Sequence, residues 1–290
     1  MLWQSLNYVS MASRREIFDR LRHTAEEVYP TAEARQIAEM ITTSLGGITR
    51  NDLIIEPNKE LTIENIDTIV AEIRAWRPVQ YIIGRADFAD MELEVAEGVL
   101  IPRPETEELV EWVAQQMPHA QSIVDVCCGS GCIAIALSRS IKHSRVWGID
   151  ISPEALAIAR RNGARYAPDV EFIEGDALCN IADCVEGKVD VVISNPPYIP
   201  EADRSAMRRN VTDYEPAIAL FVPDNDPLLF YRAIARQTRE ILNPAGELYF
   251  EIYEQYGKEM CAMLHEEGYS EVMLHEDFRG KQRMICAQVE

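Results

Sequence analysis

VVISNPPYIP, residues 191 to 200, is the stretch that decides how the rest of the chain is interpreted. Its first residues, Val191 to Ile193, are apolar without alternation, as expected of a strand covered on both faces in a parallel sheet. Pro196 and Pro197 end the strand, because proline donates no backbone N–H and has a fixed φ. Ligands of such sheets bind beyond the carboxyl ends of the strands, so Asn195 is predicted to lie where a reacting group can be held.

The four residues from Asn195 to Tyr198 have a chemistry of their own. The side-chain oxygen of Asn195 and the carbonyl oxygen of Pro196 are acceptors that can converge on one NH₂ group, and Tyr198 offers a flat face. They suit a planar nitrogen, an amide or an aromatic amine, whose weak nucleophilicity makes positioning important. The same residues, with Pro197, can equally form no more than a rigid turn after a core strand. The surrounding sequence has to decide between the two.

Composition limits the classes of function. The chain has 290 residues, enough for two domains, and 28 Lys plus Arg against 48 Asp plus Glu give a net charge of −20. No dense basic run offsets this charge, so no direct nucleic-acid partner is expected. The seven cysteines lack the spacing of a zinc site, which predicts reduced thiols and no metal. Without a long apolar run or a recognisable signal peptide, we expect a cytoplasmic protein with no membrane partner.

Residues 1–80 are predicted to form a small helical domain. Ser13 and Glu16 have the spacing of a capping box at the start of a helix, and Thr31 can cap a second one. Apolar residues then recur at helical intervals in two further segments, each closed by glycine or proline. The predicted helices cover residues 13–28, 31–45 and 62–77.

Residues 81–104 are predicted to link two domains through a β-hairpin. Residues 91–95 alternate as a half-exposed strand does, and residues 99–101 form a second short strand. The stretch that follows, IPRPETE at 101–107, places Pro104 well for the first turn of a helix. It is either only a helix start or also a lid near the ligand, and the sequence leaves both open.

Residues 105–290 alternate between strands and helices, which predicts an α/β fold with a doubly wound, Rossmann-like and mostly parallel sheet. The tail adds two strands, predicted to form a C-terminal antiparallel hairpin. Predicted strands cover residues 122–127, 145–150, 170–174, 189–194, 247–252, 271–274 and 283–287. Predicted helices lie at 132–137, after Ser152, at 228–242 and around 260–266, with a turn at 243–246.

Three strand ends carry residues suited to a nucleotide-like ligand. Gly129 and Gly131, around Ser130, let the backbone approach a ligand closely. Asp150 ends the next strand, 19 positions after Gly131, where an acidic residue suits a ribose diol. Asp176 follows the third strand, within reach of an adenine. NAD enzymes use similar parts, and each Asp alone could cap a strand or helix. The turn lacks the G-x-G-x-x-G spacing for pyrophosphate, however, which favours S-adenosyl-L-methionine.

This order of elements resembles the class I methyltransferases that modify planar nitrogens. Three further motifs lie outside the shared core: RPVQYIIG at 77–84, LIPRPETE at 100–107 and DYEP at 213–216. With them the chain resembles, over residues 13–290, the peptide chain release factor N5-glutamine methyltransferases, the HemK/PrmC family.

The resemblance implies a reaction and a set of site residues. The reaction is methyl transfer from S-adenosyl-L-methionine to the glutamine side chain in the Gly-Gly-Gln motif of class 1 release factors, in the cytoplasm. The helical domain would help to dock the release factor. The cofactor would be held by Cys127, Cys128, Gly129, Ser130, Gly131, Asp150 and Asn195, with Asp176 and Ala177 at the adenine. Asn195, Pro196, Pro197 and Tyr198 would bind the glutamine, with Asn195, Pro196 and Tyr198 catalytic.

One departure and two alternatives accompany this hypothesis. The family usually has Gly at the position of Cys127, so the closeness of backbone approach there is in question. A nucleic-acid adenine or guanine amino-methyltransferase uses the same Asn-Pro-Pro-Tyr motif, but the acidic composition and the absence of a target-recognition insertion disfavour it. A non-catalytic adaptor of the translation apparatus is a third class, against which the intact motif argues. We expect a monomer.

Overall fold

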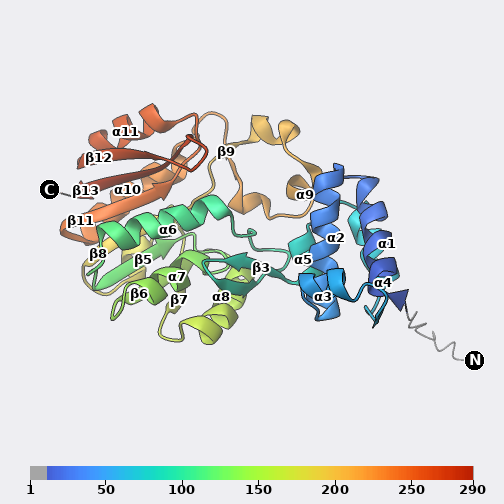
Figure 1. The fold of residues 1–290 in the computed structure, drawn as a ribbon. Coiled ribbons are helices and arrows are strands. Elements are labelled where there is room, and N and C mark those ends of the chain that lie inside the picture. The colour runs from blue at the N-terminus through green and yellow to red at the C-terminus, as the bar shows by residue number, and fades with distance from the viewer. Residues whose placement is uncertain (1–11, 290) are drawn as a thin grey trace, which may run out of the picture. The chain divides into compact units, whose positions relative to one another are not determined.

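A computed structural model describes residues 12–289, which form two compact units. The first comprises the described residues up to Gly84 together with Arg209–Tyr214, and the second comprises residues 85–208 and those from Glu215 onward. The sequence analysis did not predict that residues 209–214 belong to the first unit. Figure 1 gives the order of the elements along the chain.

The first unit is mainly helical. Buried aliphatic residues such as Leu21, Ile41 and Ile73 form its core, and Tyr214 belongs to it through a hydrogen bond from its hydroxyl to the Ala75 carbonyl (2.7 Å). Its elements are β1 (Ala12–Ser13), α1 (Arg14–Glu26), α2 (Thr31–Gly46), α3 (Arg50–Ile55), β2 (Glu60–Leu61), α4 (Ile66–Arg74), α5 (Val79–Ile83) and α9 (Arg209–Thr212).

The helix starts of this unit confirm one prediction and correct two. The capping box of Ser13 and Glu16 is present, with both reciprocal hydrogen bonds. Thr31 does not cap α2, because the N-cap is Pro30 and no side-chain cap bond forms. The third predicted helix begins at Ile66 and not at Thr62, because Asn65 has a left-handed backbone conformation (φ 55°) that a continuous helix cannot include.

The predicted hairpin exists, and its strand at residues 91–94 was predicted, but the partner strand was not. Strand β3 (Arg85–Phe88) pairs antiparallel with β4 (Met91–Glu94), while residues 99–101 form no strand. Ala89 and Asp90 join the strands with positive φ angles of 46° and 59°. A two-residue loop with two positive φ angles is typical of hairpins but usually contains Asn-Gly. Ala-Asp gave no such signal, which is why the pairing was missed.

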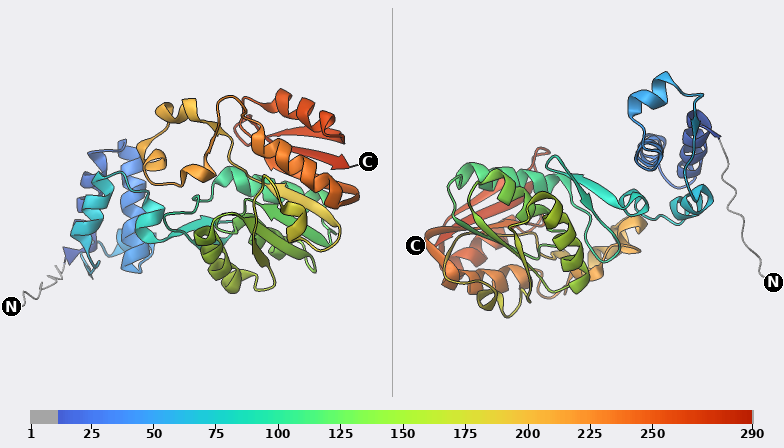
Figure 2. Two further views of the ribbon diagram at one scale, coloured as in Figure 1. Left: turned by 180° about the vertical axis from the view of Figure 1, so that it is seen from behind. Right: turned by 90° about the horizontal axis from the view of Figure 1, so that it is seen from below.

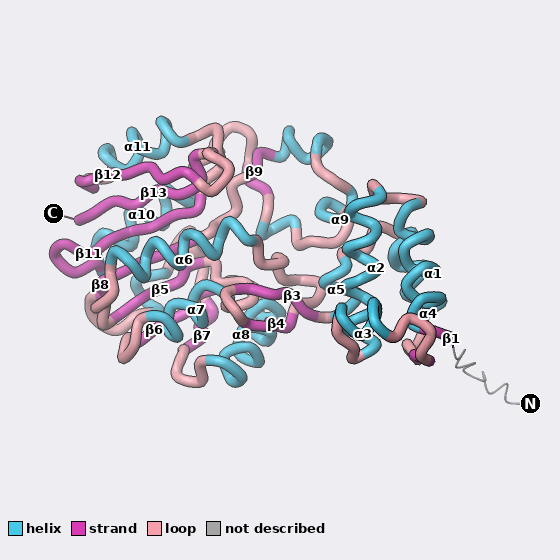
Figure 3. The backbone as a smooth tube through the Cα atoms, in the orientation of Figure 1, coloured by secondary structure: helices cyan, strands magenta, loops and turns pink. Residues whose placement is uncertain are grey.

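The second unit is built on a seven-stranded sheet of order β12-β13-β11-β8-β5-β6-β7, drawn in magenta in Figure 3. Strands β11, β8, β5, β6 and β7 are parallel to one another. At one edge of the sheet, β13 pairs antiparallel with β11 on one side and with β12 on the other. This confirms the predicted fold class. The strands are β5 (Ser122–Val126), β6 (Arg145–Asp150), β7 (Glu171–Glu174), β8 (Val189–Ser194), β11 (Leu242–Glu251), β12 (Tyr269–Glu276) and β13 (Gln282–Val289).

Helices cover both faces of this sheet (Figure 2). Alternation along β5 sends Ile123 into one core cluster and Val124 into the other. The first cluster includes α6 (Pro104–Gln116), α7 (Cys132–Ser140) and α8 (Pro153–Tyr166), and the second includes α10 (Leu229–Ile241) and α11 (Gly257–Glu266). Strands β8 and β5 are buried on both faces, as the continuous apolar run at 191–193 predicted.

The turn predicted at residues 243–246 is part of strand β11. The register to β8 shifts between Leu242 and Glu247, and Ala245 has a φ of 61°. Asn, Pro and Gly therefore produce an irregularity inside a strand here, not a break between elements. Among residues 12–289, no helix combines the length and apolar character that a bilayer crossing requires.

Candidate functional site

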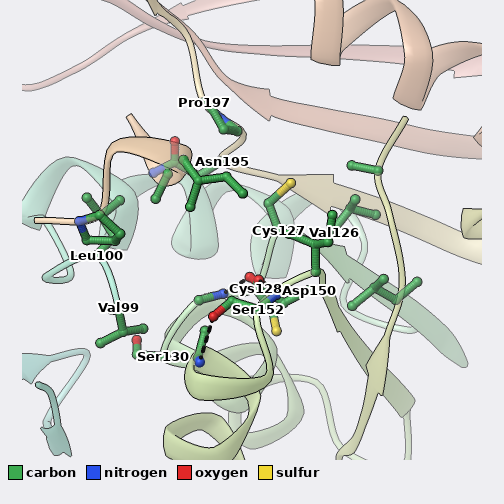
Figure 4. Close-up of a pocket in the computed structure, with 18 of the residues that line it drawn as sticks. Val99, Leu100, Val126, Cys127, Cys128, Ser130, Asp150, Ser152, Asn195 and Pro197 are labelled. Atoms are coloured by element: carbon green, nitrogen blue, oxygen red, sulfur yellow. Dashed lines mark hydrogen bonds between the residues drawn. The ribbon is translucent and has the colours of Figure 1, made fainter. Parts of the chain in front are cut away.

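One pocket of the second unit contains most of the predicted site residues. It lies at the carboxyl ends of β5, β6, β7 and β8, and Figure 4 shows Asp150 and Asn195 among the residues around it. Gly131, Pro196 and Tyr198 do not line it. The predicted residues that do are Cys127, Cys128, Gly129, Ser130, Asp150, Asp176, Ala177, Asn195 and Pro197.

The turn after β5 has a left-handed backbone at three positions. Cys127, Gly129 and Gly131 have φ angles of 62°, 55° and 79°. A Cβ at Gly131 would meet the ring of Phe172 at 2.9 Å, so glycine is needed there for packing as well as for conformation. Cys127 adopts the same conformation with a side chain, which is unfavourable for a residue with a Cβ. The departure from glycine at this position therefore has a structural consequence.

Asp150 connects this turn to the next strand. Its Oδ2 accepts a hydrogen bond from the Gly129 N–H (2.8 Å), and its Oδ1 accepts one from the Ser152 N–H (2.9 Å). Burial raises the pKa of the Asp150 carboxyl, and the backbone amides partly offset this. Each carboxylate oxygen can accept a second hydrogen bond. Asp150 can thus fix the turn and still accept hydroxyl groups of a ligand.

Two buried polar atoms near the turn have no hydrogen-bond partner among residues 12–289. They are the hydroxyl of Ser130, a residue that lines the pocket, and one oxygen of Asp125. The other Asp125 oxygen accepts from the Ala134 N–H (3.0 Å), and complete burial raises the pKa of this carboxyl well above its usual value. Unpaired buried polar atoms are uncommon and can mark a missing polar ligand. Sequence reasoning gave no role to Asp125.

The far end of the pocket combines a fixed carboxylate with apolar side chains. Asp176 accepts from the Leu178 N–H (2.8 Å) and from the Cys179 thiol (3.0 Å), which hold its side chain in place. Ile151 and Leu178, which lie close in sequence to Asp150 and Asp176, also line the pocket, as does Ile218 elsewhere in it, and the three residues are between 40% and 59% exposed. Such surfaces suit a flat ring system. Sequence reasoning did not identify these three apolar residues.

At the Asn195 end, side chains from three elements form a chain of hydrogen bonds. The Asn195 Nδ2 donates to the Thr106 Oγ1 (3.4 Å), and the Thr106 hydroxyl donates to the Glu251 Oε2 (2.6 Å). The Tyr198 hydroxyl donates to the other Glu251 oxygen (3.1 Å), and its ring stacks on that of Tyr253. Burial raises the pKa of the Glu251 carboxyl and of the Tyr198 phenol. Sequence reasoning gave no role to Thr106 or Glu251.

The IPRPETE stretch forms one wall of the pocket. Val99 to Arg103 and Thr106 line it, and Pro104 is the first residue of α6. The buried Glu215 of the DYEP motif accepts from the Ile101 N–H (3.1 Å) and from the Arg103 guanidinium. The stretch is therefore more than a helix start, because it also forms part of the pocket wall. Among the lining residues that the structure describes, Arg103 supplies the one cationic side chain.

A parallel sheet with a C-terminal antiparallel hairpin, a glycine turn after β5 and an acid at the end of β6 define a class I methyltransferase. Family models agree, with a "Methyltransferase domain" at residues 123–214 and a "PrmC N-terminal domain" at residues 16–84. The chain belongs to the release factor glutamine methyltransferase family. Within residues 12–289, no group of three or more His, Cys, Asp or Glu side chains is arranged to hold a metal ion.

The relatives are similar over nearly their whole length. The release factor glutamine methyltransferase of Bacteroides thetaiotaomicron is 40% identical over 92% of this chain and 97% of its own. That of Flavobacterium psychrophilum is 36% identical over 89% of this chain and 93% of its own. Among solved structures, a methyltransferase from Pyrococcus furiosus aligns with a TM-score of 0.52 at 17% identity, over 68% of this chain and 88% of that one. The structural likeness concerns the fold alone.

Proposed function

We propose that this protein transfers a methyl group from S-adenosyl-L-methionine to the side-chain amide N5 of the glutamine in the Gly-Gly-Gln motif of class 1 peptide chain release factors. One observation carries the proposal: Asn195, from the motif suited to a planar nitrogen, lines the same pocket as the glycine turn and Asp150. A nitrogen held at Asn195 is then beside a bound cofactor. Family membership supports the same reaction.

The residues of the pocket fit this cofactor, which supplies an electrophilic methyl group when bound. Asp150 has lone pairs free for the ribose hydroxyls, and the unpaired Ser130 hydroxyl offers a further polar contact. Asp176 and Ala177, with the apolar residues near them, suit the adenine. The glycine turn from Cys127 to Gly131 allows close backbone approach. The positive charge of Arg103 is complementary to the carboxylate of the amino-acid tail.

The chain's own contribution to the reaction is mainly to position the acceptor. The Asn195 Oδ1 and the Pro196 carbonyl oxygen accept the two hydrogens of the glutamine amide, while Pro197 and Tyr198 shape the site around it. When a weak nucleophile is held in line with its target, the reaction step no longer includes the entropy loss of a bimolecular encounter. Once alkylated, the amide nitrogen becomes acidic and releases a proton to a nearby acceptor or to water.

The remaining assignments concern the rest of the chain. The helical domain, residues 1–80, helps to dock the release factor, residues 81–104 link it to the rest, and residues 105–290 bind the cofactor and carry out the transfer. The family model named for the PrmC N-terminal domain supports a family-specific role of the first part. The enzyme works in the cytoplasm, as a monomer, without direct contact to nucleic acid.

The test is transfer of labelled methyl from S-adenosyl-L-methionine to a purified class 1 release factor. Parallel reactions contain the factor with Gln→Ala in its Gly-Gly-Gln motif, or duplex DNA. Label on the unaltered factor alone is the expected result. Equal label on the Gln→Ala factor would contradict the assignment of the acceptor atom, and label on DNA would favour an amino-methyltransferase of nucleic acid.

A further inference from the structure

The hydrogen-bond chain beside the pocket has a direction that the chemistry of its members imposes. An ionised carboxylate can only accept hydrogen bonds. Glu251 accepts from the Thr106 hydroxyl at 2.6 Å, so the single hydroxyl hydrogen of Thr106 is used. The Thr106 oxygen can then only accept from Asn195, and the group that donates to it is the Asn195 Nδ2 at 3.4 Å.

We propose that Glu251 and Thr106 are positioning residues that set the orientation of the Asn195 carboxamide, with its oxygen turned to the acceptor site. The proposal rests on the proposed function, in which the Asn195 oxygen accepts a hydrogen of the glutamine amide. If the carboxamide turned over, Asn195 would present an NH₂ group to another NH₂ group. Two donors cannot bind each other, so the acceptor would be lost from the reactive position.

The surroundings of Glu251 favour such a fixed role. Its side chain and that of Thr106 are each only 2% exposed, so water does not compete for their hydrogen bonds. The second Glu251 oxygen accepts from the Tyr198 hydroxyl, which ties the last residue of the Asn-Pro-Pro-Tyr motif to the same carboxylate. One buried group thereby holds both ends of that motif. The charged and titratable groups facing Glu251 are Arg283, Glu105 and Tyr198, and the Tyr231 hydroxyl donates to its backbone carbonyl.

The first experiment compares Thr106→Val, which keeps the shape but removes the hydroxyl, with Thr106→Ser, which keeps the hydroxyl. Single-turnover methyl transfer to the release factor should slow roughly 10–100-fold in Thr106→Val, the size expected for loss of positioning, and much less in Thr106→Ser. Cofactor affinity, measured by calorimetry, should be nearly unchanged in both. Thr238→Val is the matched control, because Thr238 is a buried threonine of α10 whose hydroxyl bonds to the Ile234 carbonyl (2.7 Å).

The second experiment is a double-mutant cycle with Asn195→Ala. If Thr106 acts through the Asn195 carboxamide, Thr106→Val should slow transfer in the normal background and have little further effect in Asn195→Ala. Equal slowing in both backgrounds would overturn the proposal, as would a Thr106→Val enzyme with the normal rate. Absence of transfer to the release factor by the unaltered enzyme would instead refute the proposed function, so the two failures are distinguishable.

The third experiment uses pH. The chain has the stated direction only while Glu251 is ionised, and burial raises the pKa of this carboxyl. Protonation as the pH falls through this raised pKa should therefore slow single-turnover transfer, measured at saturating cofactor because the pKa of Asp150 is raised as well. The side chain in Glu251→Gln does not ionise. This variant should therefore be slow at all pH values, and its rate should not show the decline at low pH (the acid limb). An unchanged acid limb in Glu251→Gln would contradict the role of Glu251.

Discussion

The two ends of the pocket are constructed differently. At the cofactor end, backbone N–H groups and left-handed turn positions dominate, and the bond from Gly129 to Asp150 spans 21 residues of the chain. At the acceptor end, side chains dominate, and the bonds from Asn195 to Thr106 and from Thr106 to Glu251 span 89 and 145 residues. Backbone contacts in a tight turn limit which residue types the turn can contain. Side-chain contacts between distant segments instead bring together residues that are ordinary in their own part of the sequence.

The largest effect on turnover should come from the acceptor end. Asn195→Ala removes the carboxamide that, in the proposed reaction, accepts a hydrogen of the substrate nitrogen. We expect kcat to fall roughly 10²–10³-fold, as when one preorganised hydrogen-bonding group of an active site is removed, while cofactor affinity changes much less. Methyl-transfer kinetics and calorimetric titration with S-adenosyl-L-methionine give the two quantities.

Asn243→Ala is the matched control for this substitution. Asn243 is a half-buried amide of the same unit that donates to Asp190, at the opposite end of β8. Its loss should leave kcat near normal. A parallel decline of turnover and cofactor affinity in Asn195→Ala would remove the distinction between the two ends of the pocket.

A substitution at the cofactor end should change the affinity for S-adenosyl-L-methionine more than it changes turnover. Asp150→Asn replaces a carboxylate that accepts from the Gly129 and Ser152 N–H groups with a side chain that has one acceptor oxygen. A hydrogen bond to a charged group contributes about 1.5–3 kcal/mol, so the Kd for S-adenosyl-L-methionine should rise roughly 10-fold or more. At saturating cofactor, kcat should fall far less than in Asn195→Ala.

Asp190→Asn provides the comparison for Asp150→Asn. Asp190 also accepts from two backbone N–H groups, those of Gln121 and Ser122, but it lies at the start of β8, away from the pocket. A similar rise of Kd in Asp190→Asn would mean that lost stability, and not a lost ligand contact, explains the result for Asp150.

This difference in construction also explains what could be predicted from the sequence. Strands β6 and β8 were predicted with their observed bounds, because buried parallel strands are short apolar runs that end at recognisable residues. In the hairpin of β3 and β4, only β4 was predicted, and its partner was placed at residues 99–101 because Ala89 and Asp90 adopt a conformation that usually indicates Asn-Gly. The place of residues 209–214 in the first unit depends on long-range contacts, for which no local pattern exists.

The candidate site divides in the same way. Gly129, Asp150 and Asp176, which line the pocket, could be predicted because close backbone approach and strand ends leave a local signature in the sequence. Thr106 and Glu251 were not, since a threonine in a helix and a glutamate at the end of a strand are ordinary residues at such positions. The exposed apolar residues of the pocket, such as Ile218, were missed because an isoleucine in a single short 3₁₀ turn has no distinctive spacing.

Substitutions of Cys127 test whether the turn at the cofactor end is constrained by its left-handed backbone. Of the predicted effects, this one is the smallest. Its φ of 62° is unfavourable for any residue with a Cβ, whereas glycine adopts it freely. Cys127→Ala keeps this strain and loses the thiol, while Cys127→Gly loses both. Cys127→Gly should therefore be more stable than Cys127→Ala, by about 0.5–1 kcal/mol in the free energy of unfolding, measured by urea denaturation.

Cys261→Ala and Cys261→Gly provide the comparison for the relative stability of the alanine and glycine variants at Cys127. Cys261 lies within helix α11, where alanine is more stable than glycine by about 1 kcal/mol. The order of Ala and Gly should thus reverse between the two positions, although both start from a partly exposed cysteine of the same unit. If alanine is the more stable replacement at both, the turn relaxes around its side chain, and the backbone at Cys127 is less constrained than the three left-handed positions imply.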